Sequence, residues 1–204
     1  MMRGMAEPAL ARPWYGATGR PEIAVPACPN CAHWEAEPGH EPVLHCSNCG
    51  WYWYPNPRPT AAVVIERERA GGELEFLLLR RAVEPAHGMW DLPAGFLEPR
   101  ETPDEGAMRE AREEAGFDVA LTGLIGAYAS RESNTVVFTY TARPVDPDAT
   151  PDPDHESSAA RWVAMSEIDE VLPSVAFRPI QQAIVGWRTL RTNRAEGGPD
   201  APAG

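Results

Sequence analysis

Three glutamates in the middle of the chain have the spacing of a metal site. Glu113 and Glu114 follow Glu110 at three and four residues, so one helical turn brings all three carboxylates to neighbouring positions. Like charges at this spacing repel one another, and a hard cation such as Mg²⁺ or Mn²⁺, which prefers oxygen ligands, would remove the repulsion. A solvated acidic helix face is the alternative interpretation of such a cluster.

The segment around these glutamates predicts a tight turn followed by a helix with well-defined ends. Thr102 is a good N-cap, Pro103 suits the first helical position, and Glu105 completes a capping box. Gly116 is the residue type that commonly follows the last turn. The sequence therefore predicts one helix between Thr102 and Gly116, entered from the glycine-containing turn LPAGFLEPRE.

The turn and the helix together resemble the Nudix box, whose pattern is G-x5-E-x7-R-E-U-x-E-E-x-G-U, where U is a bulky aliphatic residue. Ala111 is smaller than the usual aliphatic residue, and Phe117 stands at the last U position. The wider resemblance runs from about Cys28 to Arg191. All seven fixed positions of the box are matched, by Gly95, Glu101, Arg109, Glu110, Glu113, Glu114 and Gly116.

This resemblance implies a hydrolase that cleaves the pyrophosphate of a nucleoside diphosphate linked to another moiety. In the family, water attacks a phosphorus atom while Mg²⁺ or Mn²⁺ neutralises charge and orients the nucleophile. Arg109 is expected to pair with Glu101 and lock the helix to the turn. The implied metal ligands are the backbone carbonyl of Ala94 and the carboxylates of Glu110, Glu113 and Glu114.

Many members of the family add an acidic residue from a later loop, as a metal ligand or a general base. Glu156 is the candidate here, because it lies six residues before Trp162 of a predicted strand. A loop carboxylate without a role is the alternative, and Glu98, Glu132 and His155 are lesser candidates. The implied catalytic residues are therefore Arg109, Glu113, Glu114 and Glu156.

Four further residues are expected to bind substrate because of their positions: Arg80, Arg81, Tyr128 and Arg131. An ordinary surface charge is the alternative for any single arginine. The expected substrates are ADP-ribose, FAD or NADH, but the chain lacks the SQPWPFP motif that NADH pyrophosphatases carry after the box. The alternatives are a regulator that senses a nucleotide and a pyrophosphatase that removes damaged nucleoside triphosphates.

All four cysteines lie in two C-x2-C pairs, CPNC at Cys28 and Cys31 and CSNC at Cys46 and Cys49. Two such pairs predict a closed tetrahedral zinc site, which is structural because no coordination position stays open. Two disulfides are the alternative, which a reducing compartment disfavours. The segment resembles a zinc ribbon, and the aromatic residues 51–54 behind it either pack on the next domain or form a stacking surface.

The composition limits the kinds of partner. The net charge of −12 argues against non-specific binding to nucleic acid, whereas a nucleotide substrate can be held through a metal ion. The sequence contains no apolar run of about 20 residues and no apolar signal-peptide core, so we expect a cytoplasmic protein without a membrane partner. A homodimer is expected only by resemblance.

The remaining pattern predicts an α/β protein with a mixed sheet, in which the box helix and a C-terminal helix over 175–191 form an α/β/α sandwich. Strands are expected at 61–67, 74–81, 118–130, 135–144 and 160–165. The predicted organisation is a flexible arm at 1–26, a zinc ribbon at 27–57, a Nudix domain at 58–192 and a disordered tail at 193–204.

Overall fold

The structure, a computed structural model, describes residues 28, 30–31, 36–38, 44–46, 48–53 and 56–195. The arm expected over 1–26 and residues 196–204 of the expected tail lie outside this described part. The chain divides into two compact units, Met1–Pro57 and Arg58–Gly204, and each is considered by itself.

The first unit contains a small antiparallel sheet. Its strands are β1 (Ala36–Pro38), β2 (Leu44–Cys46) and β3 (Tyr52–Trp53), with β2 in the middle. Gly50 N donates to Cys46 O, and Cys46 N donates to Trp51 O, so the turn that carries the second cysteine pair is closed by backbone hydrogen bonds. A hairpin with a cysteine-bearing turn is the arrangement that a zinc ribbon requires.

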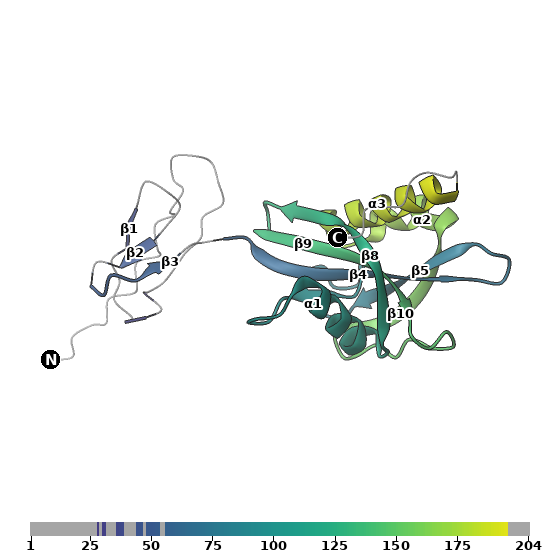
Figure 1. The fold of residues 1–204 in the computed structure, drawn as a ribbon, viewed down its shortest axis with the longest axis horizontal. Coiled ribbons are helices and arrows are strands. Elements are labelled where there is room, and N and C mark those ends of the chain that lie inside the picture. Colours follow the sequence, from purple (N-terminus) through teal and green to yellow (C-terminus); the bar gives the residue numbers. More distant parts are fainter. Residues whose placement is uncertain are drawn as a thin grey trace. The chain divides into compact units, whose positions relative to one another are not determined.

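A seven-stranded mixed sheet lies at the centre of the second unit (Figure 1). Five strands follow the order β10-β5-β4-β9-β8, in which β4 and β9 are parallel and the other neighbours are antiparallel. The mixed sheet predicted from the sequence is thereby confirmed. These strands are β4 (Arg58–Glu68), β5 (Leu74–Arg81), β8 (Val119–Ser130), β9 (Thr135–Pro144) and β10 (Ser157–Ala164).

The strands β4 and β5 separate soon after the turn that joins them. They pair only between residues 66–68 and 74–76. Further along, β7 (Ala94–Phe96) pairs with β4, and β6 (Trp90–Asp91) pairs with β5. The segment that leads into the glutamate-rich helix therefore fills the opening between two strands of the sheet and is held from both sides.

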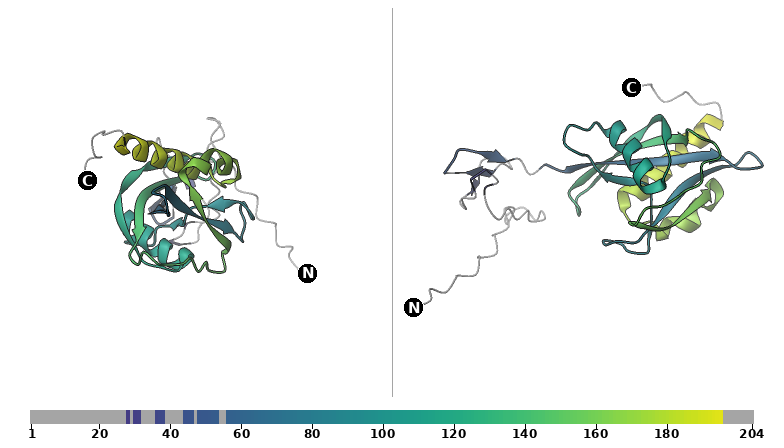
Figure 2. Two further views of the ribbon diagram at one scale, coloured as in Figure 1. Left: turned by 90° about the vertical axis from the view of Figure 1, so that its right-hand side faces the viewer. Right: turned by 90° about the horizontal axis from the view of Figure 1, so that it is seen from below.

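Helices cover both faces of the sheet (Figure 2). On one face lie α1 (Pro103–Glu110) and the π-helical turn η1 (Ala111–Ala115), and on the other lies α3 (Arg178–Ala195). The short helix α2 (Ile168–Val171) is flanked by the 3₁₀ turns η2 (Met165–Glu167) and η3 (Leu172–Ser174). This is the predicted α/β/α sandwich.

Each face of the sheet has its own apolar core, because the side chains of a strand alternate between the faces. On the α1 side, Ala107 and Ala111 pack with Ile65 and Leu77. The small alanines let the helix approach the sheet closely. On the α3 side, larger side chains fill the space, among them Phe76, Ile184 and Trp187.

Two helix boundaries differ from the prediction. The single helix predicted up to Gly116 is α-helical only to Glu110 and continues as the π-helical turn, a conformation often found at functional sites. The C-terminal helix begins at Arg178, three residues late, because Val175 and Ala176 are bonded to Trp90 of β6 in an extended conformation. It ends at Ala195, so residues 193–195 of the expected disordered tail are helical.

A buried ion pair attaches α3 to β4. The Glu66 side chain is only 1% exposed, and the Arg191 guanidinium binds it through two hydrogen bonds of 2.7 Å. Trp187 Nε1 donates a further hydrogen bond of 2.6 Å to the same carboxylate. A buried carboxylate with all these donors is fully paired, and loss of Arg191 would leave an uncompensated buried charge, which typically costs about 3–5 kcal/mol.

Candidate active site

The strand β7 passes directly beside the carboxylate of Glu110. A Cβ atom at Gly95 would overlap this carboxylate and force it to move. Glu110 is buried, and this burial raises its pKa, while the neighbouring Arg109 guanidinium acts in the opposite direction. The first glycine of the motif thus leaves the space that the carboxylate of the first of the three glutamates occupies.

Arg109 connects the helix, the preceding turn and β7. Its Nε and Nη2 atoms bind the two oxygens of Glu101 at 2.8 and 3.0 Å, and Nη2 also donates to Phe96 O at 3.1 Å. Its Nη1 atom donates to Glu110 Oε1 at 2.7 Å and to Glu113 Oε2 at 2.9 Å. The ion pair between Arg109 and Glu101 that the sequence predicted is therefore present, and it lowers the pKa of Glu101.

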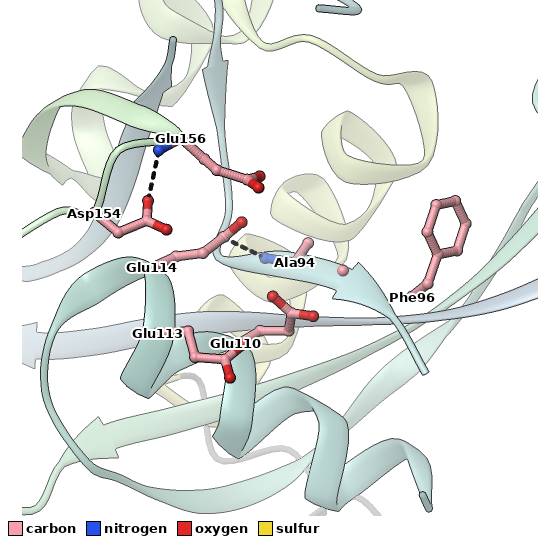
Figure 3. Close-up of a pocket in the computed structure, with 8 residues that line it drawn as sticks. Ala94, Phe96, Glu110, Glu113, Glu114, Asp154 and Glu156 are labelled. Carbon is pink, nitrogen blue, oxygen red and sulfur yellow. Dashed lines mark hydrogen bonds between the residues drawn. The ribbon is translucent and has the colours of Figure 1, made fainter. Parts of the chain in front are cut away.

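Glu114 is held by the backbone of β7. Its Oε2 atom accepts a hydrogen bond of 2.9 Å from Ala94 N (Figure 3). Burial raises the pKa of Glu114 to about 8, with smaller contributions from the charges of Glu110, Asp91 and Asp154, and the Ala94 N–H opposes the shift. A carboxylate in this environment is stabilised by a proton or by a bound cation.

A second group of carboxylates comes from the loop before β10. At the end of η1, Gly116 has φ +83°, and a Cβ there would lie 2.7 Å from Asp152 O, so the loop contacts the helix end directly. Asp152 N donates to Ala115 O, and Ala82 N donates to Glu156 O. These backbone contacts place the loop opposite the helix.

Asp154 is a site residue that the sequence analysis missed. Its Oδ1 atom accepts a hydrogen bond of 2.9 Å from Glu156 N, so the two acidic residues share one turn (Figure 3). The alternation of acidic residues in PDPDHES was a usable signal, since residues 154 and 156 can face one way. His155, between them, has a side chain that is 88% exposed.

Carboxylates from both segments line one open cavity of about 290 Å³ (Figure 3). We call Glu110, Glu113 and Glu114 the helix wall, and Asp154 and Glu156 the loop wall. The structure thus brings together every predicted ligand of Mg²⁺ or Mn²⁺ and the predicted loop residue Glu156. The complete lining consists of Ala94, Gly95, Phe96, Glu110, Glu113, Glu114, Asp154 and Glu156.

The donor set of this cavity fits a hard divalent cation. Five carboxylates face a common space, and carboxylate and carbonyl oxygens are the ligands that Mg²⁺ and Mn²⁺ prefer. Among the described residues, no side chain with a nitrogen or sulfur ligand lines this cavity. Mutual repulsion between the carboxylates would be relieved by such a cation.

The four residues expected to bind substrate do not line this cavity. Arg81 binds Asp91 through Nη1 at 3.1 Å, and Arg80 donates from Nε to Gly88 O at 3.0 Å. The Tyr128 hydroxyl packs against α3, where Gly186 leaves room for it. Arg131 lies in the turn between β8 and β9. Their role in substrate binding stays a prediction.

The four cysteines of the first unit lie together. One Sγ atom from each of Cys28, Cys31, Cys46 and Cys49 lies within 4.8 Å of the others, which is a suitable arrangement for a metal ion. The side-chain amide of Asn30 donates to Cys49 Sγ at 3.4 Å, and that of Asn48 donates to Cys31 Sγ at 3.5 Å. Each pair therefore contributes an amide donor to a thiol of the other pair.

A Nudix domain matches residues 56–182, and the chain therefore belongs to the Nudix family. Among solved structures, it is similar to a Nudix hydrolase from Nitrosomonas europaea, with 29% identity, a TM-score of 0.70 and coverage of 86% of this chain and 96% of the other. The predicted family and fold are thus confirmed.

Curated relatives extend the comparison. The chain is 30% identical over 168 residues to the NAD-capped RNA hydrolase NudC of Pseudomonas aeruginosa, which covers 82% of this chain but 57% of the relative. It is also 34% identical over 126 residues to a MutT-like protein of Streptomyces ambofaciens, covering 62% of this chain and 75% of the relative. The chain thus spans little more than half the length of the Pseudomonas relative.

No helix in the described part of the chain has both the length and the apolar character needed to cross a membrane.

Proposed function

We propose that the chain is a Mg²⁺- or Mn²⁺-dependent pyrophosphatase that hydrolyses the phosphoanhydride bond of a nucleoside diphosphate linked to another moiety. The observation that carries this proposal is the cavity between the helix wall and the loop wall, which gathers five carboxylates beside the backbone of Ala94. A site of this composition, built on a complete Nudix motif, is suited to positioning a metal ion and a pyrophosphate.

The metal would be held by Glu110, Glu113 and Glu114 together with the carbonyl of Ala94. When bound, it would neutralise charge on the pyrophosphate and make the attacking water more acidic. The chain's own contribution is to fix the ligands. Gly95 allows Glu110 to reach the strand, and the Ala94 N–H holds one oxygen of Glu114.

We assign the proton acceptor to Glu156. Within the described residues, no side chain donates a hydrogen bond to its carboxylate, which leaves both oxygens free to accept a proton from water or to bind a second cation. Asp154 accepts the Glu156 N–H and so positions the turn. A water held between the loop wall and the helix wall would have one carboxylate to orient it and another to deprotonate it.

The substrate class that the relatives favour is a dinucleotide of the NAD type. The Pseudomonas relative is named for hydrolysis of NAD-capped RNA. The box entrance LPAGFLE is similar to the corresponding segment of ADP-ribose pyrophosphatases, and we therefore extend the class to ADP-ribose and FAD. Nucleoside triphosphates are the comparison substrates, because the sequence left open a pyrophosphatase that removes damaged nucleoside triphosphates.

The test is an assay with Mg²⁺ in which NADH, NAD-capped RNA, ADP-ribose, FAD and nucleoside triphosphates are compared by release of mononucleotide and phosphate. We expect the highest kcat/KM for one of the dinucleotides or ADP-ribose. Hydrolysis in ¹⁸O-water identifies the attacked phosphorus, because the label appears in only one product. Absence of turnover with every substrate would refute the enzymatic proposal.

We propose further that the four cysteines bind one structural Zn²⁺. Four thiolates form a closed tetrahedral site without an open position for chemistry. Metal analysis of freshly purified protein should give about one zinc per chain. A zinc-free preparation in which all four cysteines are reduced and the first unit is folded would contradict this assignment.

A further inference from the structure

The guanidinium of Arg109 reaches further into the site than its structural role requires. Two of its nitrogens, Nε and Nη2, are bound to Glu101 and to Phe96 O, and these contacts already join the helix to the turn. The third nitrogen, Nη1, binds two carboxylates that line the cavity, at 2.7 Å to Glu110 and 2.9 Å to Glu113.

We propose that Arg109 is an internal counter-cation that competes with the divalent ion for the carboxylates of Glu110 and Glu113 and thereby keeps the affinity of the metal site low. The inference rests on the proposed function, since it takes the cavity to be a site for Mg²⁺ or Mn²⁺. Arg109 is then a positioning residue, which acts on the metal through the two glutamates.

The geometry of the guanidinium makes this competition specific. The group is planar and permanently charged, so anchoring Nε and Nη2 on Glu101 fixes the direction of Nη1. The Arg109 side chain is 20% exposed and that of Glu110 is 9% exposed, so water screens their contact only weakly. A cation that takes Glu110 Oε1 or Glu113 Oε2 as a ligand must share that oxygen with Nη1 or displace it.

Two roles of Arg109 predict opposite changes in metal affinity. If Arg109 served only to hold the helix and the turn together, its loss would disorder the glutamates and weaken metal binding. If it competes, its loss removes a positive charge beside the ligands and frees two oxygens, and metal binding becomes tighter. The sign of the change therefore distinguishes the two roles.

The experiment measures the Kd for Mn²⁺ by calorimetry for the wild-type chain and for Arg109→Gln. The matched control is Arg112→Gln, which removes the same charge from the next helical turn, where Arg112 binds the exposed Asp118 and does not line the cavity. We expect Arg109→Gln to bind Mn²⁺ about tenfold more tightly and Arg112→Gln to match the wild type.

Equal or weaker Mn²⁺ binding by Arg109→Gln, with a circular-dichroism spectrum like the wild type, would overturn the inference. If this variant does not fold, Arg109→Lys decides in its place. A lysine ammonium has a single nitrogen, so once it is bound to Glu101 it leaves no second nitrogen for Glu110 and Glu113. Tighter Mn²⁺ binding by this variant supports the inference, and unchanged or weaker binding overturns it. A wild-type chain that binds no Mn²⁺ would instead refute the metal site of the proposed function.

Discussion

The helix wall and the loop wall carry the same chemical groups but are fixed in different ways. In the helix wall, the carboxylates themselves are held: Arg109 binds two of them, and the Ala94 N–H binds Glu114. In the loop wall, the backbone is held by contacts from Ala82 and Ala115, and the Asp154 carboxylate accepts the Glu156 N–H. The helix wall therefore presents carboxylates in preset positions, whereas the Glu156 side chain of the loop wall can change its conformation.

The largest effect should come from the helix wall. Glu114→Gln keeps the shape of the side chain but removes the charge that a metal ligand needs, so we expect kcat to fall by about 10³-fold. Glu170→Gln on the exposed surface of α2 is the matched control and should keep wild-type activity. Near-normal turnover by Glu114→Gln would show that the helix wall does not hold the metal.

The loop wall should contribute less. For Glu156→Gln we expect kcat to fall by about 10²-fold, the usual contribution of a general base. Asp154→Asn keeps an oxygen that can accept the Glu156 N–H, so we expect only about a tenfold loss. An equal loss in Glu156→Gln and Glu114→Gln would remove the distinction between the walls.

Two glycine substitutions test how each wall is positioned. Gly95→Ala places a Cβ against Glu110 and should lower activity by at least about tenfold through the helix wall. Gly116→Ala puts a side chain at φ +83° against Asp152, so we expect about 1–2 kcal/mol of destabilisation together with altered KM. Denaturant unfolding measures the change in stability of each variant, and steady-state kinetics measures the changes in kcat and KM. If both variants changed kcat and KM in the same way, the helix wall and the loop wall would not be positioned separately.

The smallest effect should be the pH dependence of stability in chelator-treated protein. Folding raises the pKa of Glu114 from 4.5 to about 8, so between these values the folded chain binds more protons than the unfolded chain. Stability therefore falls as the pH rises through this range, and Asp91, whose pKa burial raises to about 7, acts in the same direction.

Thermal unfolding at several pH values checks this expectation. The Tm should fall by several degrees from pH 5 to pH 8, and added Mg²⁺ should raise it more at the higher pH. Glu114→Gln should flatten the decline. A Tm that rises from pH 5 to pH 8 would contradict the raised pKa values of Glu114 and Asp91.

The sequence predicted the helix wall because periodicity and a fixed motif specify it locally. The spacing of Glu110, Glu113 and Glu114 and the capping box at Thr102 are properties of neighbouring residues, and the structure reproduces the predicted capping box. The π-helical turn was not predicted, because the motif fixes the order of its residues but not the type of helical turn; the turn ends at Gly116 beside Asp152, which is distant in the sequence.

The loop wall and the arginines were harder to predict for the same reason. Glu156 was predicted through the position of its strand, whereas Asp154 had only the alternation of acidic residues in PDPDHES as a signal, which says nothing of how the loop lies against the helix. Arg81 was expected to bind substrate, and in the structure it binds Asp91 and its guanidinium lies 5.1 Å from the Phe177 ring centroid. A charged residue at a strand end has no sequence signal that distinguishes these roles.

The early separation of β4 and β5 has a consequence for how such a protein can change. The segment from β6 to β7 is inserted into the sheet and paired with a strand on either side, so its position does not depend on the length of the connection over 82–89. That connection can lengthen or shorten while Ala94 and Gly95 keep their places beside Glu110 and Glu114. The split sheet thus lets the chain vary next to the cavity without moving the backbone that lines it.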